Sequence, residues 1–295
     1  MPFSFFKRKP DTFDYEAVRS CCNCHHTFKG RYCNRCGEKI LEPGERTFIT
    51  FLNNLLNAFT FLDGKFVRSL KLVVLQPGQL SRNIAEGIRV PYMKLVSLFF
   101  VANFFYFLFP TFDSFNSSLY SQTNLMGQHS VKARGLVAKE VERRQLSMKE
   151  FEEKYQAQST NLSKLLLIIL VVALTLTNMV INYSKKNYFF DHLLISLEFY
   201  SYHLLINMLL LPVLAILLVK LANQVHWNWS EILEDRIFSW PISASVLYFL
   251  VKAQRRFYHQ KWYWAIPKAI VLFYLFMETI KLYRIVLFYI TIWTI

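Results

Sequence analysis

The segment from Pro77 to Phe109 divides the chain into two parts of different character. It begins with Pro77-Gly78, continues through a basic stretch and becomes almost wholly apolar from Leu95 to Phe109. Extended slightly at each end, this apolar run approaches the ~20 residues that a helix needs to cross the hydrocarbon core of a bilayer. The residues before it are polar and basic and include all 5 cysteines, whereas further long apolar runs follow it. The sequence therefore predicts an integral membrane protein.

The composition agrees with a membrane location. Of the 295 residues, 54% are hydrophobic and 17% are aromatic, and the formal net charge is +14. The basic excess has three interpretations: loops that follow the positive-inside rule, attraction to anionic lipid headgroups, or binding of nucleic acid. We expect the lipid bilayer and its anionic headgroups as partners. We do not expect nucleic acid, because the basic excess of the N-terminal region is modest.

The apolar runs predict an all-α integral membrane protein with about five transmembrane helices and an interfacial amphipathic helix. Two C-x-x-C knuckles between positions 21 and 36 add a small N-terminal zinc-ribbon head to this prediction. The expected spans are about 94–112, 164–182, 193–219, 237–252 and 265–292. The fifth span is open, because its charged residues could divide it or draw it to the membrane surface. A polar segment, 113–163, follows the first span on the outer side. Within it, Ser147 and Glu150 fit a capping box at the start of a small amphipathic helical element.

Composition also sets the expected domain boundaries. The parts are a basic arm at 1–20, the zinc-ribbon head at 21–40, an amphipathic interfacial segment at 47–92 and the membrane domain at 93–295. From Phe48 to Val73 the apolar residues recur at intervals of three and four, which is typical of one face of a helix. We expect this helix to be broken or bent near Asp63-Gly64.

The cysteines predict a metal site. Cys21 and Cys24 form one C-x-x-C knuckle, and Cys33 and Cys36 form a second. Each knuckle turns tightly enough for two thiolates to reach one ion, and two knuckles complete a tetrahedral sulfur site. We predict structural Zn²⁺, while iron takes the same ligand spacing and stays an open alternative. The fifth thiol, Cys22, and the neighbouring His25 and His26 are left outside the ligand set.

Charged and polar residues in or beside the third and fifth spans are candidate functional groups. A charge at the bilayer centre carries a penalty of ~2.5–3.5 kcal/mol on insertion scales, so each needs a partner or water. The candidates are Asp191, His192, Glu198, His203, Glu278 and Lys281. Glu278 and Lys281 are three residues apart and can also neutralise each other.

Several motifs together resemble a bacterial family of polytopic membrane proteins of unknown function with an N-terminal four-cysteine zinc-ribbon head. They are the two cysteine knuckles, the amphipathic segment, Pro77-Gly78, Gly87-x-Arg89-x-x-Tyr92 and the first apolar run. Asp191-His192-Leu193 resembles an acidic-His-hydrophobic stretch of that family, and Arg255-Arg256-x-Tyr258-x-Gln260 with Lys268 resembles its late basic loop. The chain departs from the pattern at Glu198 and Tyr200, where many relatives would carry histidine. The resemblance implies an architecture and no activity.

The loops also predict an orientation. Basic residues outnumber acidic ones before the first span and between the fourth and fifth spans, so the positive-inside rule puts the N-terminal head in the cytoplasm. The location expected is the bacterial cytoplasmic (inner) membrane, with multiple crossings. Residues expected at the membrane interface are Arg89, Tyr92, Arg255, Arg256, Tyr258 and Lys268.

Three functions are compatible with these features. The first is a non-enzymatic membrane protein whose metal-stabilised cytoplasmic head binds an unidentified protein partner or organises an assembly. The second is a transporter or ion pathway that uses the intramembrane acidic and histidine residues, although the sequence has no internal repeat. The third is a membrane-embedded enzyme, although the sequence has no H-E-x-x-H motif, G-x-S-x-G motif or phosphate-cradling glycine loop.

Overall fold

The computed structural model describes residues 14–21, 23–37, 64–109, 115–184, 187–224 and 235–295. The chain forms two compact units, Met1–Asp63 and Gly64–Ile295. Most of the predicted basic arm, the end of the predicted head, Cys22, the amphipathic positions before residue 64 and the end of the first predicted span lie outside the described residues.

The first unit contains a two-stranded antiparallel sheet. Strand β1 (Val18–Ser20) pairs with β2 (Thr27–Lys29), and Arg19 lies opposite Phe28. Thr27 and Lys29 are exposed while Phe28 is buried, as the alternation of side chains along a strand requires. Phe28 packs against Cys21 and Cys33, so the small core of this unit is built around two of the thiols.

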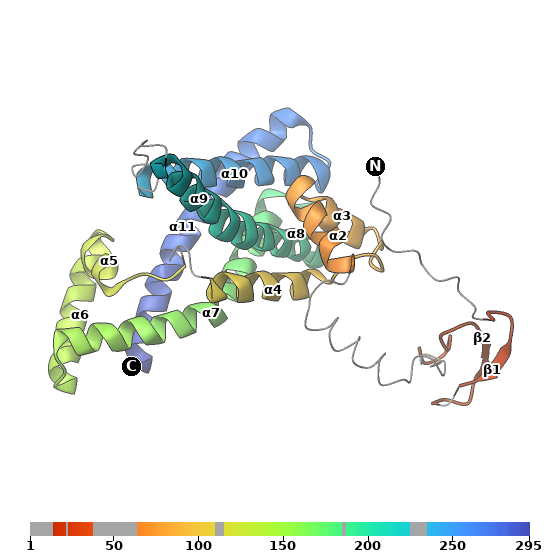
Figure 1. Ribbon diagram of the computed structural model, residues 1–295, viewed down its shortest axis with the longest axis horizontal. Coiled ribbons are helices and arrows are strands. Elements are labelled where there is room, and N and C mark those ends of the chain that lie inside the picture. The colour runs from red at the N-terminus through yellow and green to blue at the C-terminus, as the bar shows by residue number, and fades with distance from the viewer. Residues whose placement is uncertain (1–13, 22, 38–63, 110–114, 185–186, 225–234) are drawn as a thin grey trace. The chain divides into compact units, whose positions relative to one another are not determined.

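The described part of the second unit is helical. Its elements are α2 (Gly64–Leu75), α3 (Gln79–Ala85), α4 (Leu95–Leu108), α5 (Leu119–Asn124), α6 (Gln128–Arg144), α7 (Met148–Ile181), α8 (Phe189–Tyr202), η2 (His203–Leu210), α9 (Leu211–Gln224), α10 (Asp235–Arg256) and α11 (Trp262–Thr294). Figure 1 shows α8 and α9 joined as one long helix. The mostly helical fold agrees with the prediction.

Two helical segments of the described chain are long and apolar enough to cross a membrane. One is α7, Met148–Ile181, and the other is Phe189–Leu221, which joins α8, η2 and most of α9. The first predicted span forms a shorter apolar helix, Leu95–Leu108. The fourth and fifth predicted spans are also helical, as α10 and α11, although neither meets the same test of apolar character. The charged residues along α11 that made the fifth span uncertain lower its hydropathy.

The middle part of the long α8–α9 helix is wound as a π-helix, from His203 to Leu210. Pro212 follows directly in α9. A proline has no backbone N–H and its ring clashes with the carbonyl four residues earlier, which here belongs to Met208. A wider turn before Pro212 accommodates that clash, since helix irregularities concentrate at prolines and π-bulges. The long helix therefore has its π segment directly before Pro212.

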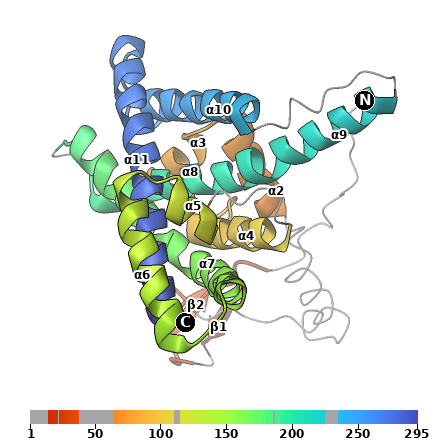
Figure 2. The ribbon, with the colours of Figure 1, turned by 90° about the vertical axis from the view of Figure 1, so that its left-hand side faces the viewer.

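Helix α7 begins earlier than the predicted second span. It starts at Met148, so the predicted polar segment 113–163 ends inside a helix that continues into the apolar run. The predicted capping box is present: Glu150 N–H donates to Ser147 Oγ, and Ser147 N–H donates to a carboxylate oxygen of Glu150. Helices α5 and α6 lie beside the C-terminal part of α11, as Figure 2 shows. The residues buried there are Leu119, Ala133, Val137, Phe151, Tyr155, Phe288 and Ile292.

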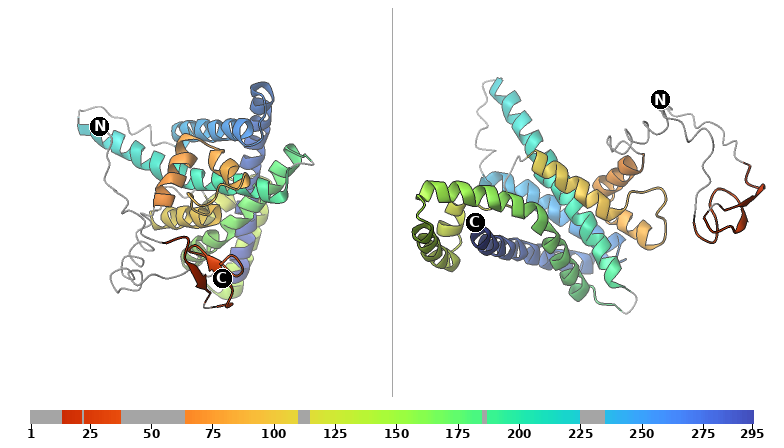
Figure 3. Two further views of the ribbon diagram at one scale, coloured as in Figure 1. Left: turned by 90° about the vertical axis from the view of Figure 1, so that its right-hand side faces the viewer. Right: turned by 90° about the horizontal axis from the view of Figure 1, so that it is seen from below.

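Helices α7 and α11 lie side by side in opposite directions (Figure 3). The hydroxyl of Tyr283 donates to the carbonyl of Ser163 at 3.2 Å midway along the pair, and the rings of Tyr155 and Phe288 meet near one end. At the other end, Lys268 Nζ donates to Asn182 Oδ1 at 3.2 Å. The contact therefore extends along most of both helices.

Candidate metal centre and buried polar contacts

Four thiols of the first unit lie in one group. The Sγ atoms of Cys21, Cys24, Cys33 and Cys36 are all within 4.8 Å of one another. Cys21 and Cys36 are 3.5 Å apart, and Cys24 and Cys33 are 3.6 Å apart. A tetrahedral site with metal–sulfur distances of ~2.3 Å would place its sulfurs ~3.8 Å apart. The donor set and its spacing therefore fit one metal ion held by four thiolates.

Tight backbone turns hold these thiols together. In the first knuckle, the N–H of His25 donates to the carbonyl of Cys21 at 3.0 Å. In the second, the N–H of Gly37 donates to the carbonyl of Cys33 at 2.8 Å, and Gly37 has φ +78°, a conformation that glycine adopts without strain. His25 and His26 are not part of the thiol group. Thiolates suit both zinc and iron, so the geometry establishes a possible metal site and not the identity of the metal.

Glu198 is fully buried in α8 and makes three hydrogen bonds with the start of α3. Its carboxylate accepts from the N–H of Gly78 and from the N–H of Ser81, each at 2.7 Å, and also from the hydroxyl of Ser81. The first N–H groups of a helix have no partner within the helix, and this end favours a negative charge. Glu198 therefore caps α3 from a distant part of the chain.

The Pro77-Gly78 turn contacts both α8, through Glu198, and α10. Gly78 has φ +82°, and a Cβ added there would lie 3.0 Å from the Cα of Ala253 in α10. On the same side, Arg256 Nη1 lies 3.5 Å from the carbonyl oxygen of Pro77. The turn thus needs glycine both for its backbone conformation and for the close approach of α10.

Asp191 and His192 have separate partners. Asp191 accepts a hydrogen bond from the N–H of Tyr188 at 2.9 Å and so caps α8. His192 is buried, and its Nδ1 lies 2.7 Å from the hydroxyl oxygen of Tyr258, with the two rings stacked. Burial raises the pKa of Tyr258, and the nearby Asp191 adds to this, so both favour the neutral hydroxyl that can donate to His192 Nδ1.

Asn182 joins this region to the late basic loop and was not singled out from the sequence. Its Oδ1 accepts from Gln260 Nε2 at 2.9 Å and from Lys268 Nζ at 3.2 Å. Asn182 Nδ2 and Gln260 Oε1 are buried without a hydrogen-bond partner in the described part of the chain. The only sequence signal for Asn182 is its position at the end of the second apolar run, just before Lys185-Lys186.

His203 lies in an aromatic environment at the start of the π segment. It is buried, its ring stacks on Phe199, and the rings of Phe115 and Phe276 meet it edge-on. Its Nδ1 accepts from Asn207 Nδ2 at 3.0 Å. The four candidates of the third span therefore have four different partners: Tyr188 for Asp191, Tyr258 for His192, the α3 N-terminus for Glu198 and Asn207 for His203.

The remaining candidates lie nearer the surface. Glu278 and Lys281 form an ion pair of 2.7 Å with side chains 43% and 61% exposed, which is the mutual neutralisation that the sequence allowed. Arg89 Nε donates to the carbonyl of Ile84 at 3.2 Å, and the hydroxyl of Tyr92 accepts from Asn83 at 2.9 Å. Arg255 is exposed at the end of α10.

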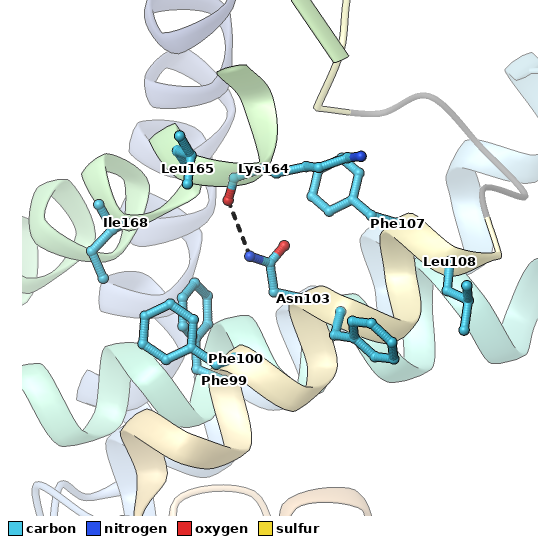
Figure 4. Close-up of a pocket in the computed structure, with 9 residues that line it drawn as sticks. Phe99, Phe100, Asn103, Phe107, Leu108, Lys164, Leu165 and Ile168 are labelled. Carbon is cyan, nitrogen blue, oxygen red and sulfur yellow. Dashed lines mark hydrogen bonds between the residues drawn. The ribbon is translucent and has the colours of Figure 1, made fainter. Parts of the chain in front are cut away.

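A pocket of about 620 Å³ lies between α4 and α7. Figure 4 shows Asn103 at its centre, donating from Nδ2 to the carbonyl of Lys164 at 3.1 Å. The ammonium of Lys164 lies 5.7 Å from the ring centroid of Phe107. The other residues that line the pocket are Phe99, Phe100, Phe104, Leu108, Leu165 and Ile168. An apolar surface of this kind suits hydrocarbon, and sequence reasoning did not find it.

Comparison with known proteins gives one family resemblance. Residues 63–107 match the profile of a family described as Protein of unknown function (DUF3667). No curated protein and no solved structure shows significant similarity to the chain. The matched segment carries the Pro77-Gly78 turn, Ser81 and helix α4, so it contains the part of α3 that Glu198 caps. The chain thus resembles a family of unknown function over α2, α3 and α4.

Proposed function

We propose that this chain is a non-enzymatic, multi-pass protein of the bacterial cytoplasmic membrane, with a zinc-stabilised cytoplasmic head that binds a partner protein or organises an assembly. The proposed membrane domain, 93–295, crosses the bilayer five times. The segment 47–92 lies at the cytoplasmic interface, and 113–163 lies outside.

Uncovered apolar faces support the membrane location. Soluble monomers rarely expose contiguous apolar patches larger than a few hundred square ångströms. Here the exposed large apolar residues recur along each of four helices, and no described part of the chain covers them. They include Phe100 and Phe104 of α4, Leu165 and Val172 of α7, Leu217 and Leu218 of α9, and Ile270 and Val271 of α11.

Helix directions support five crossings. Helices α7 and α11 are antiparallel over most of their length, so if α7 crosses the bilayer, α11 has the length and the position to cross beside it. Helices α8 and α10 also run in opposite directions, because Phe199 meets Phe249 while Tyr202 meets Ser245. Successive crossings of a membrane require this alternation. Basic residues at the N-terminal side then favour a cytoplasmic head.

The contacts of Glu198 carry the non-enzymatic part of the proposal. A catalytic acid needs access to its substrate, and an ion-carrying group needs access to its ion. The carboxylate of Glu198 instead accepts three hydrogen bonds from Gly78 and Ser81. Asp191 is similarly engaged as a helix cap, and Glu278 is paired with Lys281. These candidate acids have architectural partners. The four-thiolate group, in contrast, suits a closed structural zinc site that shapes a small binding domain.

Affinity purification of the full chain from native membranes in mild detergent tests this function, with metal analysis of the same sample. We expect one zinc per chain and a stoichiometric protein partner. Cys33→Ser should lose both the metal and the partner while the chain stays in the membrane, and Cys22→Ser should keep both. A partner that remains bound to Cys33→Ser would contradict a role for the head. A lone protein that carries a small solute, with transport dependent on His203, would support the transporter hypothesis in its place.

A further inference from the structure

A groove opens beside the start of α4, between α2, the α3–α4 connection and the start of α8. Its volume is about 630 Å³, which lies within the ~300–1,000 Å³ typical of small-molecule sites. The floor is apolar and buried, and consists of Ile84, Leu95, Leu194 and Leu197. The first turns of both α4 and α8 therefore line the groove.

The rim of the groove is positively charged. Lys65, Arg89 and Lys94 line it, all three are exposed, and none of the lining residues that the structure describes is acidic. No described acidic side chain pairs with these three cations. The Nε of Arg89 donates to the carbonyl of Ile84, which holds the guanidinium at the rim. The rim therefore presents three positive charges that lack a described counter-ion.

An exposed apolar stripe continues from the groove along α4. Val96 lines the groove and is 49% exposed, and Phe100 and Phe104 follow at intervals of four with 55% and 56% of their surface exposed. Residues at this spacing share one face of a helix. The groove and the stripe together join a cationic end to an apolar surface.

We propose that this groove binds an anionic phospholipid of the cytoplasmic leaflet. The phosphate lies among Lys65, Arg89 and Lys94, and an acyl chain covers the apolar floor and continues along Phe100. Soluble phosphate would leave the floor exposed, and a zwitterionic phospholipid would leave the cationic rim uncompensated. The proposal rests on the membrane location in the proposed function.

Native mass spectrometry of the full chain, released from detergent, tests the site. The probes are phosphatidylglycerol and phosphatidylcholine with identical acyl chains, and glycerol phosphate as the headgroup without chains. We expect phosphatidylglycerol to bind with a preference of about tenfold or more over phosphatidylcholine, since each basic residue near an anionic headgroup adds appreciable attraction. Glycerol phosphate should not displace it.

Two variants of equal charge separate a defined site from general attraction. Replacing Lys65, Arg89 and Lys94 by Gln should reduce the preference about tenfold. Replacing Lys71, Arg255 and Lys261 by Gln removes three exposed charges that do not line the groove and should leave the preference within about twofold. Thermal unfolding and membrane levels of both variants show whether they fold.

The outcomes are distinct. Equal losses in the two variants, displacement by glycerol phosphate, or no preference between the two lipids would overturn the proposed site. If the chain is extracted from membranes by alkaline carbonate, the membrane location itself fails. If it resists extraction but shows no lipid preference, only the lipid site is wrong.

Discussion

The carboxylate of Glu198 in α8 accepts hydrogen bonds from the backbone N–H and the hydroxyl of Ser81 in α3, 117 positions earlier in the chain. A third bond, from the N–H of Gly78, completes the cap. The contact fixes the start of α3 against the core and beside the groove. It gives Glu198 an architectural role, which the hypothesis of a functional acid in the third span did not include.

Glu198→Gln should destabilise the fold, although glutamine has nearly the same side-chain size as glutamate. The amide has one acceptor oxygen in place of two and brings an N–H group toward donors that it cannot satisfy. Hydrogen bonds to a charged group contribute ~1.5–3 kcal/mol each, so we expect the free energy of unfolding to fall by about 2 kcal/mol. Thermal unfolding in detergent measures this, together with protease cleavage in residues 64–94.

Glu86→Gln is the matched control, because it makes the same chemical change at a partly exposed ion pair with Arg82, outside the proposed membrane spans. Such pairs contribute ~0–1 kcal/mol, so its effect should be small. If the two variants unfold at the same temperature, the cap on α3 does not contribute to stability.

Gly78→Ala should be strongly destabilising. An alanine there would adopt φ +82° and place its Cβ 3.0 Å from the backbone of Ala253. The left-handed conformation alone costs ~1–2 kcal/mol for a residue with a Cβ, and the displacement of α10 adds to this. Chemical or thermal unfolding of the purified protein should show a loss of at least that size.

Gly135→Ala tests the same substitution without either constraint. Gly135 lies in the exposed middle of α6, and a Cβ there meets nothing within 4 Å. Alanine in a helix interior is favoured over glycine by ~0.5–1 kcal/mol, so this variant should be slightly stabilised. A similar loss of stability in both variants would disprove the close packing of the Pro77-Gly78 turn.

Tyr258→Phe should remove the hydrogen bond between Tyr258 and His192, two residues that the sequence analysis selected for separate reasons. Phenylalanine keeps the stacked ring but removes the hydroxyl that lies 2.7 Å from His192 Nδ1. The loss of one buried hydrogen bond should lower the free energy of unfolding by ~1 kcal/mol or more. Tyr263→Phe, at an exposed ring early in α11, should change it by less than half as much. Equal effects would mean that the His192–Tyr258 contact is not formed.

Local patterns predicted the parts of the fold that depend on neighbours in the chain. The spacing of Cys21, Cys24, Cys33 and Cys36 was enough to predict the thiol group, because each knuckle closes within four residues. The capping box at Ser147 was also predicted. The prediction did not extend the helix of the second span back to this cap. The change from polar to apolar residues near Lys164 suggested that the helix begins there, whereas α7 begins at Met148. No glycine or proline interrupts residues 148–181, and that absence was the available signal.

Contacts between distant segments could not be predicted. Nothing in the residues around Glu198 indicates that its partners are Gly78 and Ser81, because the pairing is created only when α3 packs on α8. Similarly, Asn182 contacts Gln260 and Lys268 only because α7 and α11 are antiparallel neighbours. The sequence could place such polar residues in apolar surroundings, which shows that they need partners but not which ones.

Removal of the proposed zinc should unfold the head and leave the proposed membrane domain intact. Structural zinc contributes ~10–16 kcal/mol of apparent binding free energy in small zinc-finger peptides, more than a core of Phe28, Cys21 and Cys33 can replace. A strong chelator or Cys33→Ser should abolish metal binding and make residues 14–37 sensitive to protease. Cys22→Ser should retain one metal per chain. Equal metal loss in the two variants would contradict the ligand assignment.

The C-terminus should lie on the same side of the membrane as α6. The C-terminal residues Phe288 and Ile292 of α11 pack with Phe151 and Tyr155 of α7, so the end of the chain lies beside the polar start of α7. A reporter that is active only outside the cytoplasm should therefore work both when inserted near Gln145 and when fused after Ile295. A reporter active only in the cytoplasm should work at the N-terminus. A cytoplasmic signal from the C-terminal fusion would mean that α11 does not cross, and that its charges at Glu278 and Lys281 hold it at the membrane surface.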